Sequence, residues 1–253
     1  MFSLRLVCSP EREDALIAEL YDAGTAGIAD EPGGLRAFFA DDARTDDLLA
    51  RFAAFLAELR REPDVDWEQT ARDAWPPLLV GERLFLAPSW NTAPAPAGRL
   101  RLEIHPGMAC GTGWHPCTQL CLAALERTVQ PGMTVLDVGA GSGILSDAAR
   151  LLGAGIVIAC DIDFDTLQTA REHMSVSMFA GSADAVRSGT ADLILANISS
   201  AAAEELAPEF ARVRHPRSTV IVSGFTEDDL PEGYGECELL GKEGWACLIQ
   251  RGG

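Results

Sequence analysis

Hydrophobic and polar positions repeat with two different periods over the first seventy residues. The apolar residues Leu48, Phe52, Phe55 and Leu59 recur at helical spacing, whereas shorter runs alternate as strands do. A turn at Glu31-Pro32-Gly33-Gly34 separates two of these runs, because its glycines allow the backbone angles of a tight turn. The predicted elements are a strand at 2–8, a helix at 11–23, strands at 25–29 and 35–39, a helix at 46–60 and a strand at 65–67. This order, β-α-β-β-α-β, is that of the ferredoxin-like split βαβ fold.

The pattern changes after residue 70. Proline and tryptophan interrupt 71–104, which we interpret as a structured linker. From about residue 105 onward, short β-branched or leucine-rich runs alternate with segments of helix length, which predicts parallel strands joined by crossover helices. These predicted strands are 135–138, 155–160, 193–196 and 219–223. We therefore expect an α/β protein, with a Rossmann-like domain at 105–253 and a smaller ferredoxin-like α+β domain at 1–70.

Composition and charge narrow the classes of function. Of 253 residues, 47% are hydrophobic, which argues against a disordered chain. The 38 acidic and 20 basic residues give a net charge of −18, which disfavours direct nucleic-acid binding and suits a basic partner. The sequence has no signal-like N-terminal stretch and no apolar run near 20 residues, so we expect a cytoplasmic protein without a membrane anchor. The seven cysteines include no CxxC pair, so we expect reduced, mostly buried thiols.

The strongest chemical signal is a buried strand that runs into a glycine-rich turn, Val135 to Leu145. Gly139, Gly141 and Gly143 allow a ligand to approach the backbone closely, and the helix that follows offers free N–H groups. The dinucleotide fingerprint G-x-G-x-x-G requires Gly or Ala where this chain has Ile144. The spacing G-x-G-x-G therefore favours S-adenosylmethionine over NAD, although such glycines can also be simple turn residues.

Two carboxylates accompany this loop. Asp137 precedes the first glycine and suits a cationic cofactor. Asp161 follows the next predicted strand, where a carboxylate can hold both ribose hydroxyls of an adenosine, in NAD as well as in S-adenosylmethionine. Asp163 has an alternative interpretation as a helix N-cap.

Two further segments carry candidate site residues. A second glycine-rich stretch runs from His105 to Cys121 into a predicted helix, and a predicted strand at 191–196 leads into Asn197. Asn197 then lies at the carboxyl end of the sheet, where ligands of open α/β folds bind. His115 could contact substrate or cofactor, or make a structural hydrogen bond at the start of the helix. The other histidines are isolated in sequence from one another and from cysteine pairs, so we expect no metal site.

Together these segments resemble the PrmA family of S-adenosylmethionine-dependent methyltransferases, which methylate large-subunit ribosomal protein L11. The family's P-G-x-A-x-G-T-G-x-H-P-T-T loop matches 106–118, V-L-D-V-G-x-G-S-G-I-L matches 135–145, D-I-D matches 161–163, and A-N-I-L-A matches 196–198 in part. The resemblance extends over nearly the whole chain and is loosest in the first seventy residues. The chain departs from it at Trp114, Cys117, Ser199 and Ser200, and the connection after Arg171 is short, which leaves the adenine contacts near 182–184 open.

The resemblance implies roles for individual residues. Thr112, with the backbone of Gly111 and Gly113, would cover the methionine end of the cofactor, although Thr112 could be an ordinary helix-start residue. The side-chain carbonyl of Asn197 and the backbone carbonyl of Ile198 would accept hydrogen bonds from the target nitrogen. Asn197 could instead be a strand-end turn residue.

We therefore expect a monomeric protein N-methyltransferase that modifies lysine or N-terminal amines of L11, a basic substrate held by the first domain. One alternative is a small-molecule methyltransferase, if Trp114, Ser199 and Ser200 have reshaped the acceptor pocket. Another is a cofactor-binding regulatory module without turnover.

Overall fold

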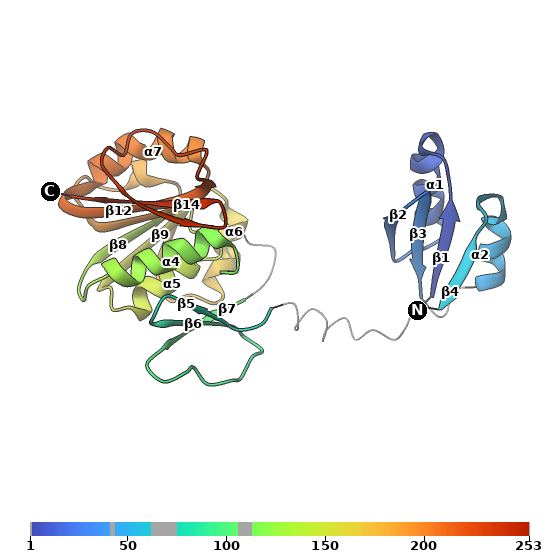
Figure 1. The fold of residues 1–253 in the computed structure, drawn as a ribbon, viewed down its shortest axis with the longest axis horizontal. Helices are drawn as coiled ribbons and strands as arrows, with labels where there is room; N and C mark the ends of the chain where they lie inside the picture. Colours follow the sequence, from blue (N-terminus) through green and yellow to red (C-terminus); the bar gives the residue numbers. More distant parts are fainter. Residues whose placement is uncertain (1, 41–43, 62–74, 106–112, 253) are drawn as a thin grey trace. The chain divides into compact units, whose positions relative to one another are not determined.

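The computed structural model describes residues 2–40, 44–61, 75–105 and 113–252 (Figure 1). The chain divides into two compact units, residues 1–74 and residues 75–253, which we describe separately. Within the described residues, no helix is long and apolar enough to cross a membrane. Six of the seven cysteines lie in the described part of the chain, and all six are free thiols.

The first unit is an antiparallel sheet with the strand order β2-β3-β1-β4. Its elements are β1 (Phe2–Val7), α1 (Pro10–Asp22), β2 (Gly27–Glu31), β3 (Gly34–Phe39), α2 (Thr45–Arg51), the 3-10 turn η1 (Ala53–Phe55) and β4 (Glu58–Arg61). Alternate residues of β1, including Leu4 and Leu6, are buried with Leu16 and Leu20 of α1. The predicted order β-α-β-β-α-β is found, but its last strand is β4 rather than a strand at 65–67.

The predicted helix at 46–60 is wrong in its second half. α2 ends at Arg51, and Leu56 adopts a left-handed conformation (φ 51°) that directs the chain into β4. Phe52 and Phe55 are buried as the helical spacing requires, but Leu59 is 46% exposed on a strand that pairs with β1. Backbone pairing along β1 thus overrides the local helical period. The predicted strand at 65–67 lies outside the described residues.

The second unit begins with a three-stranded sheet, β5 (Leu78–Val80), β6 (Leu84–Pro88) and β7 (Leu100–Ile104). Buried side chains of these strands belong to the core formed by α4 (Pro116–Thr128) and α5 (Ile144–Leu151). The described part of 71–104 is therefore packed against the helices of the second unit.

A seven-stranded sheet forms the centre of this unit, in the order β10-β9-β8-β11-β12-β14-β13. The strands are β8 (Thr134–Val138), β9 (Ile156–Asp161), β10 (Ser177–Ala180), β11 (Ala191–Asn197), β12 (Arg214–Thr226), β13 (Glu238–Lys242) and β14 (Trp245–Arg251). Strands β8 to β12 pair in parallel, whereas β14 is antiparallel to both of its neighbours. All four predicted strands are present, and the predicted parallel α/β fold is confirmed.

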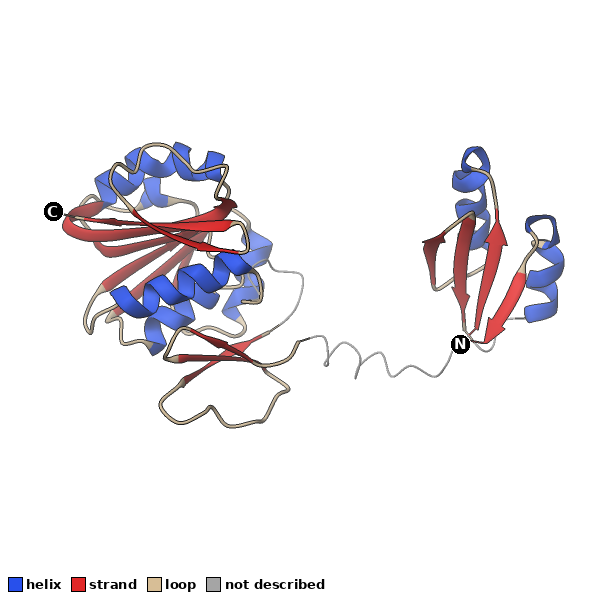
Figure 2. Cartoon of the chain, viewed as in Figure 1, coloured by secondary structure: helices blue, strands red, loops and turns tan. Residues whose placement is uncertain are grey.

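Helices cover both faces of the large sheet (Figure 2). Val135 of β8 packs in the core shared with α4 and α5, and Leu136 packs in the core shared with α7 (Ser200–Val213). α6 (Phe164–Arg171) packs on β9 and β10. Because the sheet is buried on both faces, its parallel strands read as continuous apolar runs.

Candidate functional site

The glycine-rich turn lies where β8 ends and α5 begins. Gly139, Gly141 and Gly143 all have positive φ angles, of 70°, 55° and 76°. The backbone N–H groups of Gly139 and Ala140 donate to the carbonyl of Cys160, at 2.9 and 3.0 Å, which fixes the turn against the end of β9. These left-handed angles favour glycine, and a Cβ would lie 2.6 Å from Ile198 Cγ2 at Gly139 and 1.9 Å from Met174 Sδ at Gly143, so neither position has room for a side chain.

Asp137 is buried directly below this turn and is only 1% exposed. Its Oδ2 accepts a hydrogen bond of 2.6 Å from the Ser146 hydroxyl, but its buried Oδ1 has no partner among the described residues. Burial raises the pKa of Asp137 to about 6. A buried carboxylate oxygen without a donor is costly, so the geometry favours a donor or a cation near this oxygen.

Asp161, at the end of β9, is fixed by backbone groups on both of its oxygens. Oδ2 accepts from the N–H of Gly141 at 2.9 Å, and Oδ1 accepts from the N–H of Asp163 at 3.0 Å. Asp163 in turn caps α6, since its Oδ1 accepts from the N–H groups of Asp165 and Thr166. These bonds hold the pKa of Asp163 below its usual value. They support the interpretation of Asp163 as a helix N-cap.

Asn197 ends β11, beside β8 on one side and β12 on the other. Its Nδ2 donates to the Oγ1 of Thr118 at 3.1 Å, and Thr118 is a buried residue of α4. The amide oxygen Oδ1 is buried and has no hydrogen-bond partner in the described structure. Among the described residues, Asn197 therefore carries a buried acceptor without a donor at the carboxyl edge of the sheet, next to the glycine-rich turn.

Ile198 contacts two glycines, Gly139 in the turn after β8 and Gly224 in β12. A Cβ added to Gly139 would lie 2.6 Å from its Cγ2, and one added to Gly224 would lie 2.3 Å from its carbonyl oxygen. The N–H of Ile198 donates to the carbonyl of Ser223 at 2.8 Å. The backbone of Ile198 can take this position only because Gly224 lacks a side chain, and its side chain can take its position only because Gly139 does.

Gly111 and Thr112, two of the predicted site residues, lie outside the described residues. Gly113 is described and has a φ of 89°, and a Cβ there would lie 2.7 Å from a methyl carbon of Leu86. His115 caps α4, because its Nδ1 accepts from the N–H of Cys117. The structural interpretation of His115 therefore has direct support.

Comparison with known proteins agrees with this geometry. The family model "Ribosomal protein L11 methyltransferase (PrmA)" matches residues 32–251. The chain belongs to this family. A ribosomal protein L11 methyltransferase of Burkholderia pseudomallei (strain K96243) is 38% identical over 210 residues, covering 79% of this chain and 69% of the relative. A ribosomal protein L11 methyltransferase of Burkholderia thailandensis is 35% identical over 252 residues, covering 94% of this chain and 80% of the relative.

A crystal structure of ribosomal protein L11 methylase from Lactobacillus delbrueckii subsp. bulgaricus superposes with a TM-score of 0.62 at 30% identity. It covers 70% of this chain and 99% of that one. Membership of the PrmA family confirms the expected methyltransferase fold, methyl transfer as the activity and S-adenosylmethionine as the cofactor.

Three positions that depart from the PrmA pattern have partners within the fold. The Trp114 ring meets the Trp75 ring edge-on at 4.8 Å and packs against the core of α4 and β5–β7. Ser199 caps α7, and the Ser200 hydroxyl donates to Asp229 at 2.5 Å. These contacts account for the three residues by packing and capping.

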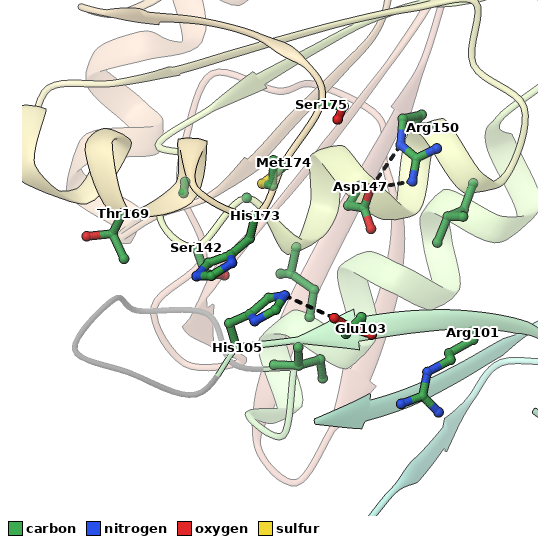
Figure 3. A pocket seen from close by; sticks show the side chains of 15 residues that line it. Arg101, Glu103, His105, Ser142, Asp147, Arg150, Thr169, His173, Met174 and Ser175 are labelled. Atoms are coloured by element: carbon green, nitrogen blue, oxygen red, sulfur yellow. Dashed lines mark hydrogen bonds and ion pairs between the residues drawn. The ribbon is translucent and has the colours of Figure 1, made fainter. Parts of the chain in front are cut away.

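A cavity of about 300 Å³ lies next to the glycine-rich turn, between β7, α5 and the end of α6 (Figure 3). The imidazole rings of His105 and His173 stack there at 3.7 Å. The expectation that these histidines are isolated is therefore wrong, because folding brings together positions that are far apart in sequence. Burial, with His173 alongside, lowers the pKa of His105. Ser142 and Gly143 also line this cavity, which adjoins the turn on the side of α5.

Proposed function

We propose that this chain methylates amino groups of ribosomal protein L11, at lysine side chains or the N-terminal amine, with S-adenosylmethionine as the donor. The free, buried Oδ1 of Asn197 beside the glycine-rich turn is the observation that carries this proposal. A protein with this arrangement can hold an amine where a methyl group is delivered.

The residues around the turn fit the cofactor. Gly139, Gly141 and Gly143 would let its methionine and ribose lie against the backbone, and the unpartnered Oδ1 of Asp137 would face its positive charge. Asp161 would hold the ribose hydroxyls. The loop with Gly111, Thr112 and Gly113 would cover the methionine end.

The cofactor supplies an electrophilic methyl group on a positively charged sulfur. The protein must therefore present a neutral amine in line with that group and keep water away. At pH 7, deprotonating a lysine with a pKa of ~10.4 costs about 5 kcal/mol, and deprotonating an α-amine costs about 1 kcal/mol. Burial beside a cation lowers either pKa, because both effects disfavour the charged ammonium.

Two oxygens would orient the amine. The Oδ1 of Asn197 and the carbonyl oxygen of Ile198 would each accept one N–H, which leaves the nitrogen lone pair directed away from them and toward the methyl group. The bond from Nδ2 to Thr118 would keep the Asn197 amide from rotating. The ammonium must release one proton to solvent before it can accept the methyl group, and the neutral amine keeps the two N–H groups that these oxygens would bind.

The first unit would hold the protein substrate. The net charge of −18 suits a basic partner such as a ribosomal protein, and it disfavours direct contact with RNA. We place the reaction in the cytoplasm, with the enzyme acting as a monomer.

The test is intact-mass spectrometry of recombinant L11 from the same source, incubated with this protein and S-adenosylmethionine. We expect mass gains in steps of one methyl group, and none when S-adenosylhomocysteine replaces the donor. An unchanged L11 mass, with an enzyme shown by calorimetry to bind S-adenosylhomocysteine, would refute L11 as the substrate. That result would favour the two alternatives, a small-molecule methyltransferase or a cofactor-binding module without turnover.

A further inference from the structure

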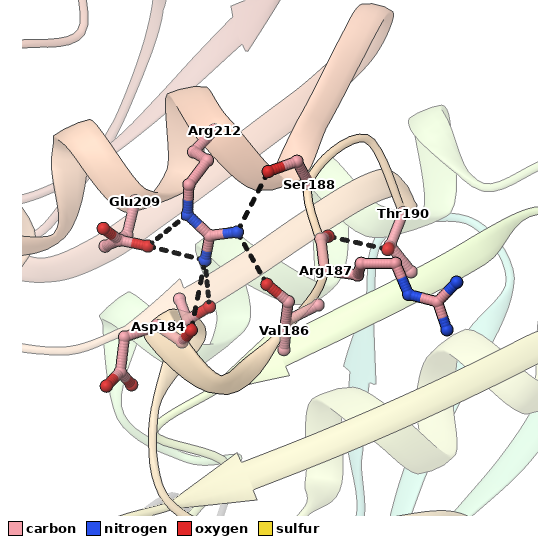
Figure 4. A network of polar contacts seen from close by, with 8 residues as sticks. Asp184, Val186, Arg187, Ser188, Thr190, Glu209 and Arg212 are labelled. Atoms are coloured by element: carbon pink, nitrogen blue, oxygen red, sulfur yellow. Dashed lines mark hydrogen bonds and ion pairs between the residues drawn. The ribbon is translucent and has the colours of Figure 1, made fainter.

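One arginine binds three backbone carbonyls and one hydroxyl of a short segment, residues 183–188. Arg212, in the last turn of α7, donates through Nη2 to the carbonyls of Ala183 and Asp184, at 2.9 and 3.3 Å (Figure 4). Its Nη1 donates to the carbonyl of Val186 at 2.7 Å and to the hydroxyl of Ser188 at 3.2 Å. The segment 183–188 is thus held at four points by one side chain.

The same guanidinium is oriented by Glu209, one turn earlier on α7. The Nε of Arg212 donates to the Oε2 of Glu209 at 2.6 Å, which forms an ion pair within the helix. An arginine has five N–H donors in a rigid planar fork, and here its three nitrogens contact one carboxylate oxygen, three backbone carbonyls and one hydroxyl. A lysine could not bridge the same four acceptors, because its ammonium is a single point with three donors.

The position of this segment connects it to the cofactor. It follows β10, whose last residue, Ala180, pairs with Asp161 of β9. The N–H of Gly181 donates to the carbonyl of Asp161 at 2.9 Å, so 182–188 starts at the edge of the sheet where that carboxylate lies. If Asp161 holds the ribose, the base attached to that ribose extends toward the next strand outward, which is β10.

We propose that Arg212 is a positioning residue for the adenine of the cofactor, because it fixes the backbone of 183–188 that receives the base. The inference rests on the cofactor site proposed above and names how its adenine side is built. Arg212 itself would not touch the adenine.

The segment 183–188 depends on Arg212 because it has little regular structure of its own. Only the three residues of η2 (Ala183–Ala185) are regular, so few backbone bonds of its own hold it. Hydrogen bonds from a charged donor are stronger than neutral ones and fix the carbonyl directions. Without the guanidinium the segment would sample other conformations, and cofactor affinity would fall by the fraction of time spent in them.

The experiment compares four proteins in full-length form: wild type, Arg212→Gln, Arg212→Lys and Arg187→Gln. Arg187 is a matched control because it lies in the same segment, carries the same charge and extends away from the Arg212 network (Figure 4). Calorimetry measures the affinity for S-adenosylhomocysteine and for S-inosylhomocysteine, which carries oxygen in place of the adenine 6-amino group. Steady-state kinetics with L11 then separates KM for S-adenosylmethionine from kcat.

We expect Arg212→Gln to bind S-adenosylhomocysteine about tenfold more weakly and to lose most of its preference over the inosine analogue. KM for S-adenosylmethionine should rise with little change in kcat. Arg212→Lys should be intermediate, and Arg187→Gln should match wild type.

Two results would overturn the proposal. One is unchanged affinity for S-adenosylhomocysteine in Arg212→Gln. The other is equal weakening for both analogues, since a role confined to general stability lowers affinity without changing the preference for adenine. If Arg212→Gln does not fold, Arg212→Lys decides by the same two criteria. A wild-type protein that binds the cofactor but leaves L11 unmodified would refute the substrate while the Arg212 comparison still stands.

Discussion

The cofactor side and the acceptor side of the site are held in place by different parts of the chain. On the cofactor side, backbone N–H groups of the glycine-rich turn bind the carbonyl of Cys160 and the carboxylate of Asp161, so neighbouring strand ends fix each other. On the acceptor side, a single side-chain bond between Asn197 and Thr118 sets the amide, and Gly224 makes room for the carbonyl of Ile198. The bond from Gly141 to Asp161 joins residues 20 positions apart in the chain, whereas the bond from Asn197 to Thr118 joins residues 79 positions apart.

This difference predicts which property a substitution on each side of the site changes. Changes on the cofactor side should alter binding and the pH dependence of folding, since a buried carboxylate lies under the turn. Changes on the acceptor side should lower the rate of methyl transfer and leave cofactor affinity nearly intact.

The largest expected effect concerns Asp137. Its pKa is raised to about 6 in the folded state by burial, so between about pH 4 and pH 6 folding takes up a proton. Stability from this group is therefore present below about pH 4 and is lost as pH rises through 6, by up to about 3 kcal/mol. In the cofactor-free protein, Asp137→Asn should remove this dependence.

Urea unfolding of wild type and Asp137→Asn at several pH values measures the effect. The variant should gain in stability relative to wild type as pH rises from 4 to 7, and it should bind S-adenosylmethionine more weakly. A stability difference that is constant over this range would contradict the assignment.

Gly224→Ala tests the acceptor side. The new Cβ would lie 2.3 Å from the carbonyl oxygen of Ile198, a backbone atom that cannot simply rotate away. We expect kcat to fall about a hundredfold, equivalent to about 2.7 kcal/mol in the barrier, with S-adenosylhomocysteine affinity within a few fold of wild type.

Gly153→Ala is the matched control. Gly153 has a similar φ of 107°, against 105° at Gly224, but open space around its Cβ position. It therefore carries the same backbone strain without displacing Ile198. Equal losses of activity in both variants would show that strain alone, and not the position of the carbonyl, is responsible.

Thr118→Val should have the smallest effect of the three. Valine keeps the shape of threonine but removes the oxygen that accepts from the Nδ2 of Asn197. The amide should then rotate more freely, and kcat should fall about tenfold, the scale of one hydrogen bond. Steady-state kinetics should show restoration in Thr118→Ser, and a KM effect without a kcat effect would argue against this role.

The sequence predicts the cofactor side better than the acceptor side. The runs around 135–138 and 193–196 predict β8 and β11 because strands buried on both faces are continuously apolar, and the glycine spacing marks the turn between β8 and α5. The bond from Asn197 to Thr118 and the network of Arg212 leave no such local signal. They join residues that only the topology of the sheet brings together.

The two wrong sequence predictions, the long helix at 46–60 and the isolated histidines, also arise from contacts between residues far apart in the chain. The helical spacing through Leu59 predicts one long helix, but pairing with β1 converts its end into β4. His105 and His173 are far apart in the sequence, but β7 and the end of α6 bring their rings into contact.

The most direct test of the central claim is the single-turnover rate of L11 methylation by Asn197→Ala, with Asn91→Ala as a control at an asparagine outside the site. Calorimetry with S-adenosylhomocysteine on the same proteins establishes that the cofactor still binds. We expect a loss of at least about a hundredfold in rate for Asn197→Ala with nearly unchanged cofactor affinity, and wild-type behaviour for Asn91→Ala. Methylation by Asn197→Ala at the wild-type rate would contradict that claim.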